Sequence, residues 1–118
     1  MTKEEFLSEI STAEVDEQKV KKIQETYGIS LPLQLQQLIS CVDETVFFDD
    51  DSRILSFQEI IDAEEDLHTD FKTAGIIPVA DCGDNDFVVF NSADNTWAKY
   101  NIIDEVSFKK RTNLCEVL

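Results

Sequence analysis

Apolar residues recur every three or four positions through the N-terminal half of the chain, a pattern typical of helices that pack one face on a core. Three times a Ser or Thr stands three positions before a Glu, the spacing of a capping box that marks where a helix begins. These boxes are Thr2–Glu5, Ser11–Glu14 and Ser56–Glu59. The predicted helices cover about residues 3–10, the stretch from the second box to Tyr27, residues 32–42, and the stretch from the third box to about Leu67.

Beyond Gly75 the apolar period changes from helical to extended. Runs of β-branched and aromatic residues, bounded by turn residues, predict strands. The predicted strands cover residues 45–48, 76–80, 87–90 and 97–102. Pro78 has no backbone N–H to donate, so it is expected at a sheet edge or a bulge. Trp97 and Tyr100 are expected on opposite faces of their strand.

A last helix is predicted after Ser107, with Phe108, Cys115 and Leu118 facing inward. The resulting order of helices, a strand, a helix and a strand meander implies an α+β fold with a mostly antiparallel sheet flanked by helices. At 118 residues the chain is expected to form a single domain over 1–118.

The three cysteines, Cys41, Cys82 and Cys115, are odd in number and far apart in the sequence. They are predicted to be free thiols in a reducing compartment and to act as small buried apolar residues. No apolar run has the length of a membrane span, and the first residues are acidic where a signal peptide would be basic. A cytoplasmic protein is therefore expected.

Charge is the most unusual feature of the composition, because 25 acidic residues against 10 basic ones give a formal net charge of −15. Most of the excess lies between residues 43 and 94, whereas the last part of the chain is nearly neutral. Such a field repels nucleic acid and anionic membranes and attracts cationic proteins. A basic protein is therefore the expected partner, although the charge could also serve solubility alone.

Enzymatic chemistry is difficult to assemble from this sequence. His68 is the only histidine, it stands among acidic residues, and no Cys or Ser nucleophile is placed beside it by any motif. The three glycines are isolated, so there is no phosphate-binding loop. No cofactor is expected.

One acidic segment could hold a divalent cation. Residues Asp81–Asp86 contain three Asp and one Asn, but Val89 stands where a calcium loop needs its closing Glu. A turn stabilised by Asp and Asn is the expected structure. A metal-dependent hydrolase that uses this loop, alone or paired in space with Asp49–Asp51, is kept as an alternative.

The acidic residues fit a protein-binding face better, because exposed carboxylates bind arginine and speed association with a basic protein. An α+β fold could bring three acidic groups to one side of the molecule. The first group is Asp49, Asp50 and Asp51, the second is Asp84 and Asp86, and the third is Glu64, Glu65 and Asp66. Phe47 and Phe48 are candidate aromatic anchors beside the first group, though one or both could belong to the core.

Four segments in order resemble the SUKH superfamily, in the branch named after the yeast cell-wall assembly regulator. They are Tyr27–Pro32, the Leu35-x-x-Leu38-Ile39 pattern, Ile54–Ile61 and Ile77–Phe87. The resemblance covers about residues 14–103 and implies an α+β domain with a central, mostly antiparallel sheet. It also implies a bacterial immunity protein that binds and neutralises a polymorphic toxin, often a nuclease. The alternative it leaves open is a regulatory or scaffold module without a toxin, as in the eukaryotic relatives.

Overall fold

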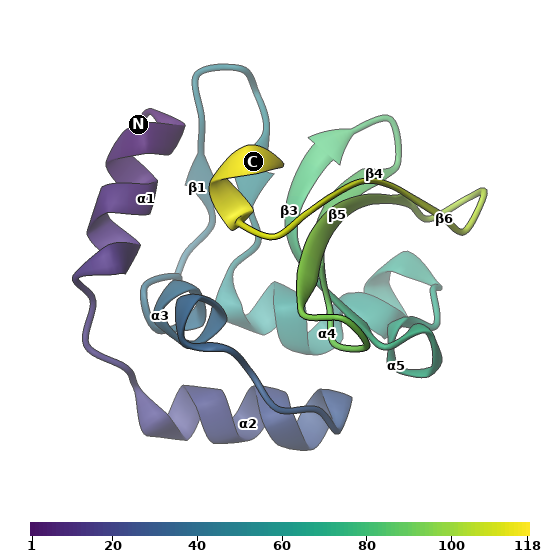
Figure 1. Cartoon of the computed structure of the whole chain (residues 1–118), viewed down its shortest axis with the longest axis horizontal. Helices are drawn as coiled ribbons and strands as arrows, with labels where there is room; N and C mark the ends of the chain where they lie inside the picture. Colours follow the sequence, from purple (N-terminus) through teal and green to yellow (C-terminus); the bar gives the residue numbers. More distant parts are fainter.

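The computed structural model describes residues 1–118 and contains five α-helices, a six-stranded sheet and a short C-terminal 3-10 helix (Figure 1). The helices are α1 (Lys3–Ser11), α2 (Glu17–Tyr27), α3 (Leu33–Ser40), α4 (Phe57–Leu67) and α5 (Phe71–Ala74). The strands are β1 (Val46–Phe47), β2 (Arg53–Ile54), β3 (Ile76–Gly83), β4 (Asp86–Asn91), β5 (Thr96–Asn101) and β6 (Val106–Arg111), and the 3-10 helix is η1 (Leu114–Glu116). The α+β prediction is confirmed.

Two of the three capping boxes begin helices as predicted. The Thr2 hydroxyl accepts a hydrogen bond from the Glu5 amide at 3.1 Å, where α1 begins. At the start of α4, the Ser56 hydroxyl accepts from the Glu59 amide at 3.2 Å and the Glu59 carboxylate accepts from the Ser56 amide at 3.0 Å. Each bond satisfies an amide that would otherwise have no partner in the first turn.

The box predicted at Ser11 is wrong, because Ser11 is the last residue of α1. Asp16 caps α2 instead, and its carboxylate accepts from the Gln18 and Lys19 amides. An Asp is as good a cap as a Ser, and here the short connection after α1 leaves Asp16 in the extended backbone conformation that a cap needs. The left-handed Gly28 ends α2 as predicted.

All six strands pair antiparallel in sequence order, with α4 and α5 inserted between β2 and β3. Pro78 lies opposite Val89, and the register shifts between Pro78 and Ala80, so the predicted bulge is present. β2 and α5 were not among the predicted elements, since two to four residues are too few to show a period.

Both faces of the central sheet are buried, because Phe87, Val88, Val89 and Phe90 in β4 are all inaccessible to solvent. Phe90 pairs with Trp97 on one face, with ring centroids 5.2 Å apart. On the other face, Tyr100 lies opposite Phe87 and its ring centroid is 6.4 Å from that of Phe71 in α5. Trp97 and Tyr100 therefore lie on opposite faces, as predicted.

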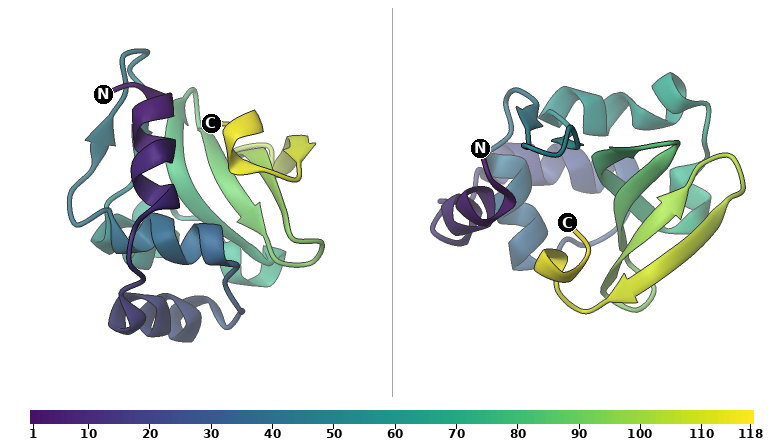
Figure 2. Two further views of the ribbon diagram at one scale, coloured as in Figure 1. Left: turned by 60° about the vertical axis from the view of Figure 1, so that its left-hand side comes forward. Right: turned by 90° about the horizontal axis from the view of Figure 1, so that it is seen from above.

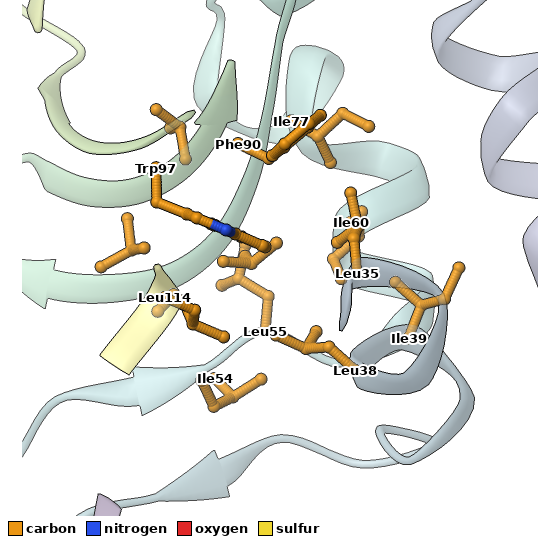
Figure 3. Packing of buried hydrophobic residues seen from close by; sticks show 14 of the residues in the cluster. Leu35, Leu38, Ile39, Ile54, Leu55, Ile60, Ile77, Phe90, Trp97 and Leu114 are labelled. Atoms are coloured by element: carbon orange, nitrogen blue, oxygen red, sulfur yellow. The ribbon is translucent and has the colours of Figure 1, made fainter. Parts of the chain in front are cut away.

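The Trp97 face packs against α3 and the C-terminal segment. Figure 3 shows Trp97, Leu114 and Leu38 directed into the space between the sheet and α3. These three side chains belong to a cluster of 29 buried hydrophobic residues that joins every helix to the sheet. The C-terminal segment crosses this face of the sheet on its way to η1 (Figure 2).

The helix predicted after Ser107 is wrong, because residues 106–111 form β6 and are exposed throughout. Phe108 is 42% exposed, and Cys115 is exposed rather than inward-facing. Val106 and Phe108 alternate with Ser107 and Lys109, a period of two that six residues do not distinguish from a helical one. The open edge of β5 decides the outcome, since it offers backbone partners that the sequence pattern does not reveal.

The prediction that the cysteines are buried is also wrong. Cys41 and Cys115 are exposed and Cys82 is half-buried, and all three are free thiols. Burial raises the pKa of the Cys82 thiol. Partial burial also raises the pKa of the Cys41 thiol. None of the five helices combines the length and the apolar character needed to cross a membrane.

The capping boxes lead to a test of local stability. We expect Ser56→Ala to lower the free energy of unfolding by about 1 kcal/mol in urea denaturation, because the amide of Glu59 loses its acceptor. Ser11→Ala is the matched control, since the Ser11 hydroxyl donates only to the Ser8 carbonyl at the exposed end of α1. Its effect should stay within about 0.5 kcal/mol. Equal losses for the two variants would contradict the assignment of caps.

Candidate partner-binding site

The loop between β1 and β2 carries the first predicted acidic group, Asp49, Asp50 and Asp51. Phe48 anchors the loop: its side chain is buried, and its ring meets the Phe6 ring edge-on at a centroid distance of 5.7 Å. The Phe48 amide donates to the Ser52 carbonyl at 2.9 Å, which closes the loop and leaves the three Asp residues at its tip.

The two candidate aromatic anchors therefore have different environments. Phe48 is 5% exposed and belongs to the core, whereas Phe47 is 63% exposed at the surface. Successive residues of a strand point to opposite faces, so only one of the pair can face the core. Phe47 is the aromatic residue next to the acidic loop that a partner could reach.

Cations of the same chain neutralise part of this loop. Lys3 Nζ lies 2.6 Å from an Asp50 carboxylate oxygen, and the N-terminal amine lies 3.7 Å from Asp49. The hydrogen bond from Lys3, helped by those from Ser52, holds the pKa of Asp50 well below its usual range. Asp51, at the tip of the loop, has no cation within 4.0 Å.

A cavity of about 280 Å³ lies between this loop and the start of α1. Its lining residues are Thr2, Lys3, Glu4, Phe48, Asp49 and Asp50. Sites for small organic ligands usually measure about 300–1,000 Å³ and are mostly apolar, whereas this cavity has a single hydrophobic residue. Its lining combines three carboxylates, Glu4, Asp49 and Asp50, with the ammonium group of Lys3, which is already paired with Asp50.

The turn between β3 and β4 carries the second acidic group. Asp84 and Asn85 both have positive φ, 54° and 65°, and form a two-residue hairpin turn, a conformation that Asp and Asn tolerate. Asp84 is exposed. The Asp86 carboxylate accepts a hydrogen bond from the Asn101 side chain at 2.9 Å, which fixes it beside the turn.

Two acidic residues join this group that the sequence did not single out. The Ile102 amide donates to the Asn85 carbonyl at 3.0 Å and so draws the turn between β5 and β6 against the turn between β3 and β4. Asp104 and Glu105 in the former turn are exposed and make no ion pair. The only sequence signal for this placement was the alternation of apolar residues in β6. Read as a strand after β5, that alternation would have placed the turn between β5 and β6 beside Asp84.

The β1–β2 loop and the β3–β4 turn lie at the same end of the molecule, uppermost in Figure 1 and in the left view of Figure 2. We call this surface the acidic end and define it by Asp49, Asp50, Asp51, Asp84 and Asp86. The third predicted group does not join it, since α4 lies in the lower half of both views.

That third group lies at the C-terminal end of α4. Glu64 is engaged within the chain, because its carboxylate lies 3.6 Å from Lys72 Nζ and accepts from the Lys72 amide at 2.9 Å. Glu65 and Asp66 are exposed. The structure therefore brings together two of the three predicted groups and leaves Glu64, Glu65 and Asp66 apart from them.

The carboxylates of the Asp81–Asp86 segment are directed to different partners. Asp81 accepts from the Gly83 amide at 2.9 Å and lies 3.8 Å from Arg53, while Asp86 bonds to Asn101. No group of three or more His, Cys, Asp or Glu side chains is arranged to hold a metal ion. The hydrolase alternative therefore has no geometric support.

Most of the negative charge of the protein is not neutralised internally. Only eight of the 25 carboxylates lie within 4.0 Å of a cation. The pairs are mainly exposed, and such pairs are screened by water and contribute little to stability. The surface consequently keeps a strong negative field that extends about 8 Å into physiological salt.

The sequence profile of the SMI1/KNR4 family (SUKH-1) matches residues 14–112, most of the chain. The chain belongs to this family. The match includes α2 through β6, and it covers both loops of the acidic end. Neither a curated protein nor a solved structure matches this SUKH-1 chain.

The Lys3–Asp50 contact can be tested by titration. We expect Lys3→Met to raise the pKa of Asp50 toward the ordinary value of about 3.9, though not fully, because the bonds from Ser52 remain. A carbon-detected NMR titration of the carboxyl groups measures this directly. Because the pKa of Asp50 is lower in the folded than in the unfolded protein, its stabilising effect is present above about pH 4 and is lost as the pH falls toward the folded pKa.

The matched control is Lys22→Met, which removes one positive charge from an exposed lysine without an ion pair. It should leave the Asp50 titration unchanged. If Lys3→Met had no larger effect than this control, the Lys3–Asp50 contact would not be what lowers the pKa.

Proposed function

We propose that this SUKH-1 protein is a non-enzymatic, cytoplasmic immunity protein that binds a basic toxin domain through its acidic end and so blocks the toxin's own binding surface. The observation that carries the proposal is the excess of carboxylates without an internal cation, gathered in part on two neighbouring loops. Family membership agrees with an interaction module.

The charge of the acidic end favours a cationic protein over other partners. Toxins that cleave nucleic acid carry basic surfaces to hold phosphate groups, and these surfaces are attracted to Asp51 and Asp84. Carboxylates form paired hydrogen bonds with the guanidinium group of arginine, which gives the contact a defined geometry. A phosphate backbone or an anionic membrane would be repelled by the same field.

Two features supply contacts other than long-range attraction. The cavity beside Phe48 has the volume to receive one lysine or arginine side chain of the partner, and Glu4 is the carboxylate in its lining that has no cation of its own chain within 4.0 Å. Phe47, the exposed residue before Phe48 in the chain, offers the aromatic contact that commonly stabilises the centre of an interface. With these residues covered by the toxin, the basic surface that the toxin needs for its substrate is covered as well.

The test uses the purified protein and a basic toxin domain encoded beside its gene, with association measured by biolayer interferometry at several salt concentrations. We expect tight binding whose association rate falls steeply as salt increases, because attraction to the acidic end guides the encounter. The double variant D51N/D84N should slow association about ten-fold or more at low salt.

The matched control, E65Q/D66N, removes the same amount of charge from the end of α4 and should slow association by less than about three-fold. An equal effect of the two double variants would show that only net charge matters and would contradict a role for the acidic end. Absence of binding to any such neighbour would favour the regulatory or scaffold module.

A further inference from the structure

β6 forms an open edge of the sheet. It is the last strand in the sheet order, it pairs only with β5, and all six of its residues are exposed. The right-hand view of Figure 2 shows β6 at the rim of the sheet, with no other segment beyond it. An edge strand presents unpaired backbone N–H and C=O groups, which can pair with a strand of another chain.

Exposed apolar side chains are concentrated on the same strand and its turn. Ile103, Val106 and Phe108 are 69%, 54% and 42% exposed, and they make up half of the large exposed hydrophobic residues of the protein. Val106 and Phe108 are two positions apart in β6, so they lie on the same face of the sheet. An apolar pair at an open edge is a feature that monomeric proteins usually avoid.

The sequence around this pair is complementary to itself when two copies run antiparallel. Residues 105–109 read Glu-Val-Ser-Phe-Lys: an acid, an apolar residue, a central Ser, an apolar residue and a base. With Ser107 opposite Ser107 of a second copy, Val106 lies opposite Phe108, and Glu105 lies opposite Lys109. Every apolar residue then meets an apolar residue, and every charge meets its opposite.

The charges at the two ends of this segment are free to make such contacts. Neither Glu105 nor Lys109 has an ion-pair partner within 4.0 Å in its own chain. Their neighbour Lys110, by contrast, is held by Asp94 at 2.5 Å. Glu105 and Lys109 therefore make no ion pair within one copy and are available to each other in an antiparallel pair.

We propose that the protein self-associates through β6, with residues 106–108 of two copies pairing antiparallel about a two-fold axis at Ser107 and the Glu105 and Lys109 side chains meeting at the two ends of the paired segment. The partner is a second copy of the same chain, and the proposal does not depend on toxin binding. Such a contact is isologous and closes after two copies, because each β6 has only one open edge. A parallel arrangement would place Glu105 against Glu105 and Lys109 against Lys109, so the charges select the antiparallel one.

The geometry of β6 limits the contact to this short segment. Glu105 and Lys109 have φ of +56° and +53°, and the pairing with β5 shifts register between Trp97 and Lys99, so the extended backbone that a second copy can pair with is limited to Val106–Phe108. Two short edges bury less than the area of roughly 1,200–2,000 Å² that stable complexes share. We therefore expect a weak dimer, with a dissociation constant on the order of 100 µM.

Sedimentation velocity of the full chain at concentrations from about 10 µM to 1 mM tests the proposal. Wild-type protein should change from monomer to dimer over this range. E105K and K109E should each weaken dimerisation about ten-fold or more, because each turns two attractive contacts into two repulsive ones. An equimolar mixture of E105K and K109E should associate as well as the wild type, since each Lys of one chain then meets a Glu of the other.

The double variant E105K/K109E has the wild-type net charge of −15 and should also dimerise as the wild type does. E14K and K22E change the net charge by the same amounts at exposed residues without ion pairs and should leave dimerisation unchanged. All substituted residues are exposed, and circular dichroism checks that the variants are folded.

A protein that stays monomeric up to about 1 mM would overturn the proposal. So would a dimer that the single charge reversals weaken no more than E14K and K22E do, or one that the mixture fails to restore. Because Glu105 lies in the turn next to Asp84, toxin binding is tested separately with D51N/D84N, which leaves residues 105–109 unchanged.

Discussion

The two central strands are apolar on both faces, and the rest of the structure depends on this constraint. Phe87–Phe90 in β4 and Ile76–Ala80 in β3 are buried without interruption, although successive residues point to opposite sides of the sheet. Each side therefore needs its own cover. α5 supplies part of it for the face of Tyr100, whereas α3 and the C-terminal segment cover the face of Trp97. The helices thus follow from the sheet, because an uncovered apolar face would remain in contact with water.

Covering both faces leaves the ends and edges of the sheet as the places where charge can accumulate. The turns at the acidic end use Asp51, Asp84 and Asn85 at positive φ, a conformation that Asp and Asn adopt more readily than other residues with side chains. The residues that close these turns therefore also supply the exposed carboxylates. The positive φ that these turns require thus contributes to the acidic surface that the proposed function uses. β6, at the open edge, differs in character, because it combines exposed apolar residues with charges of both signs.

The elements that could be predicted from the sequence are those specified by adjacent residues. The capping box at Ser56 and the apolar run Phe87–Phe90 are each defined by neighbouring residues alone, and both were located correctly. The Ser11 box failed because a competing cap, Asp16, follows within the same connection. β6 could not be predicted, since its conformation is decided by the free edge of β5. For the same reason the sequence indicated which residues are acidic but not that Glu64 lies apart from Asp84, because that separation depends on the tertiary arrangement.

Native-state hydrogen exchange tests most directly the claim that two-sided burial of β3 and β4 organises the molecule. If the claim holds, the amides of Ile77, Val88 and Val89 exchange only through global unfolding and share the highest protection. The amides of residues 49–51 and 84–85, at the tips of the acidic end, exchange faster by several orders of magnitude. Protection in β3 and β4 no higher than in these turns would contradict the account.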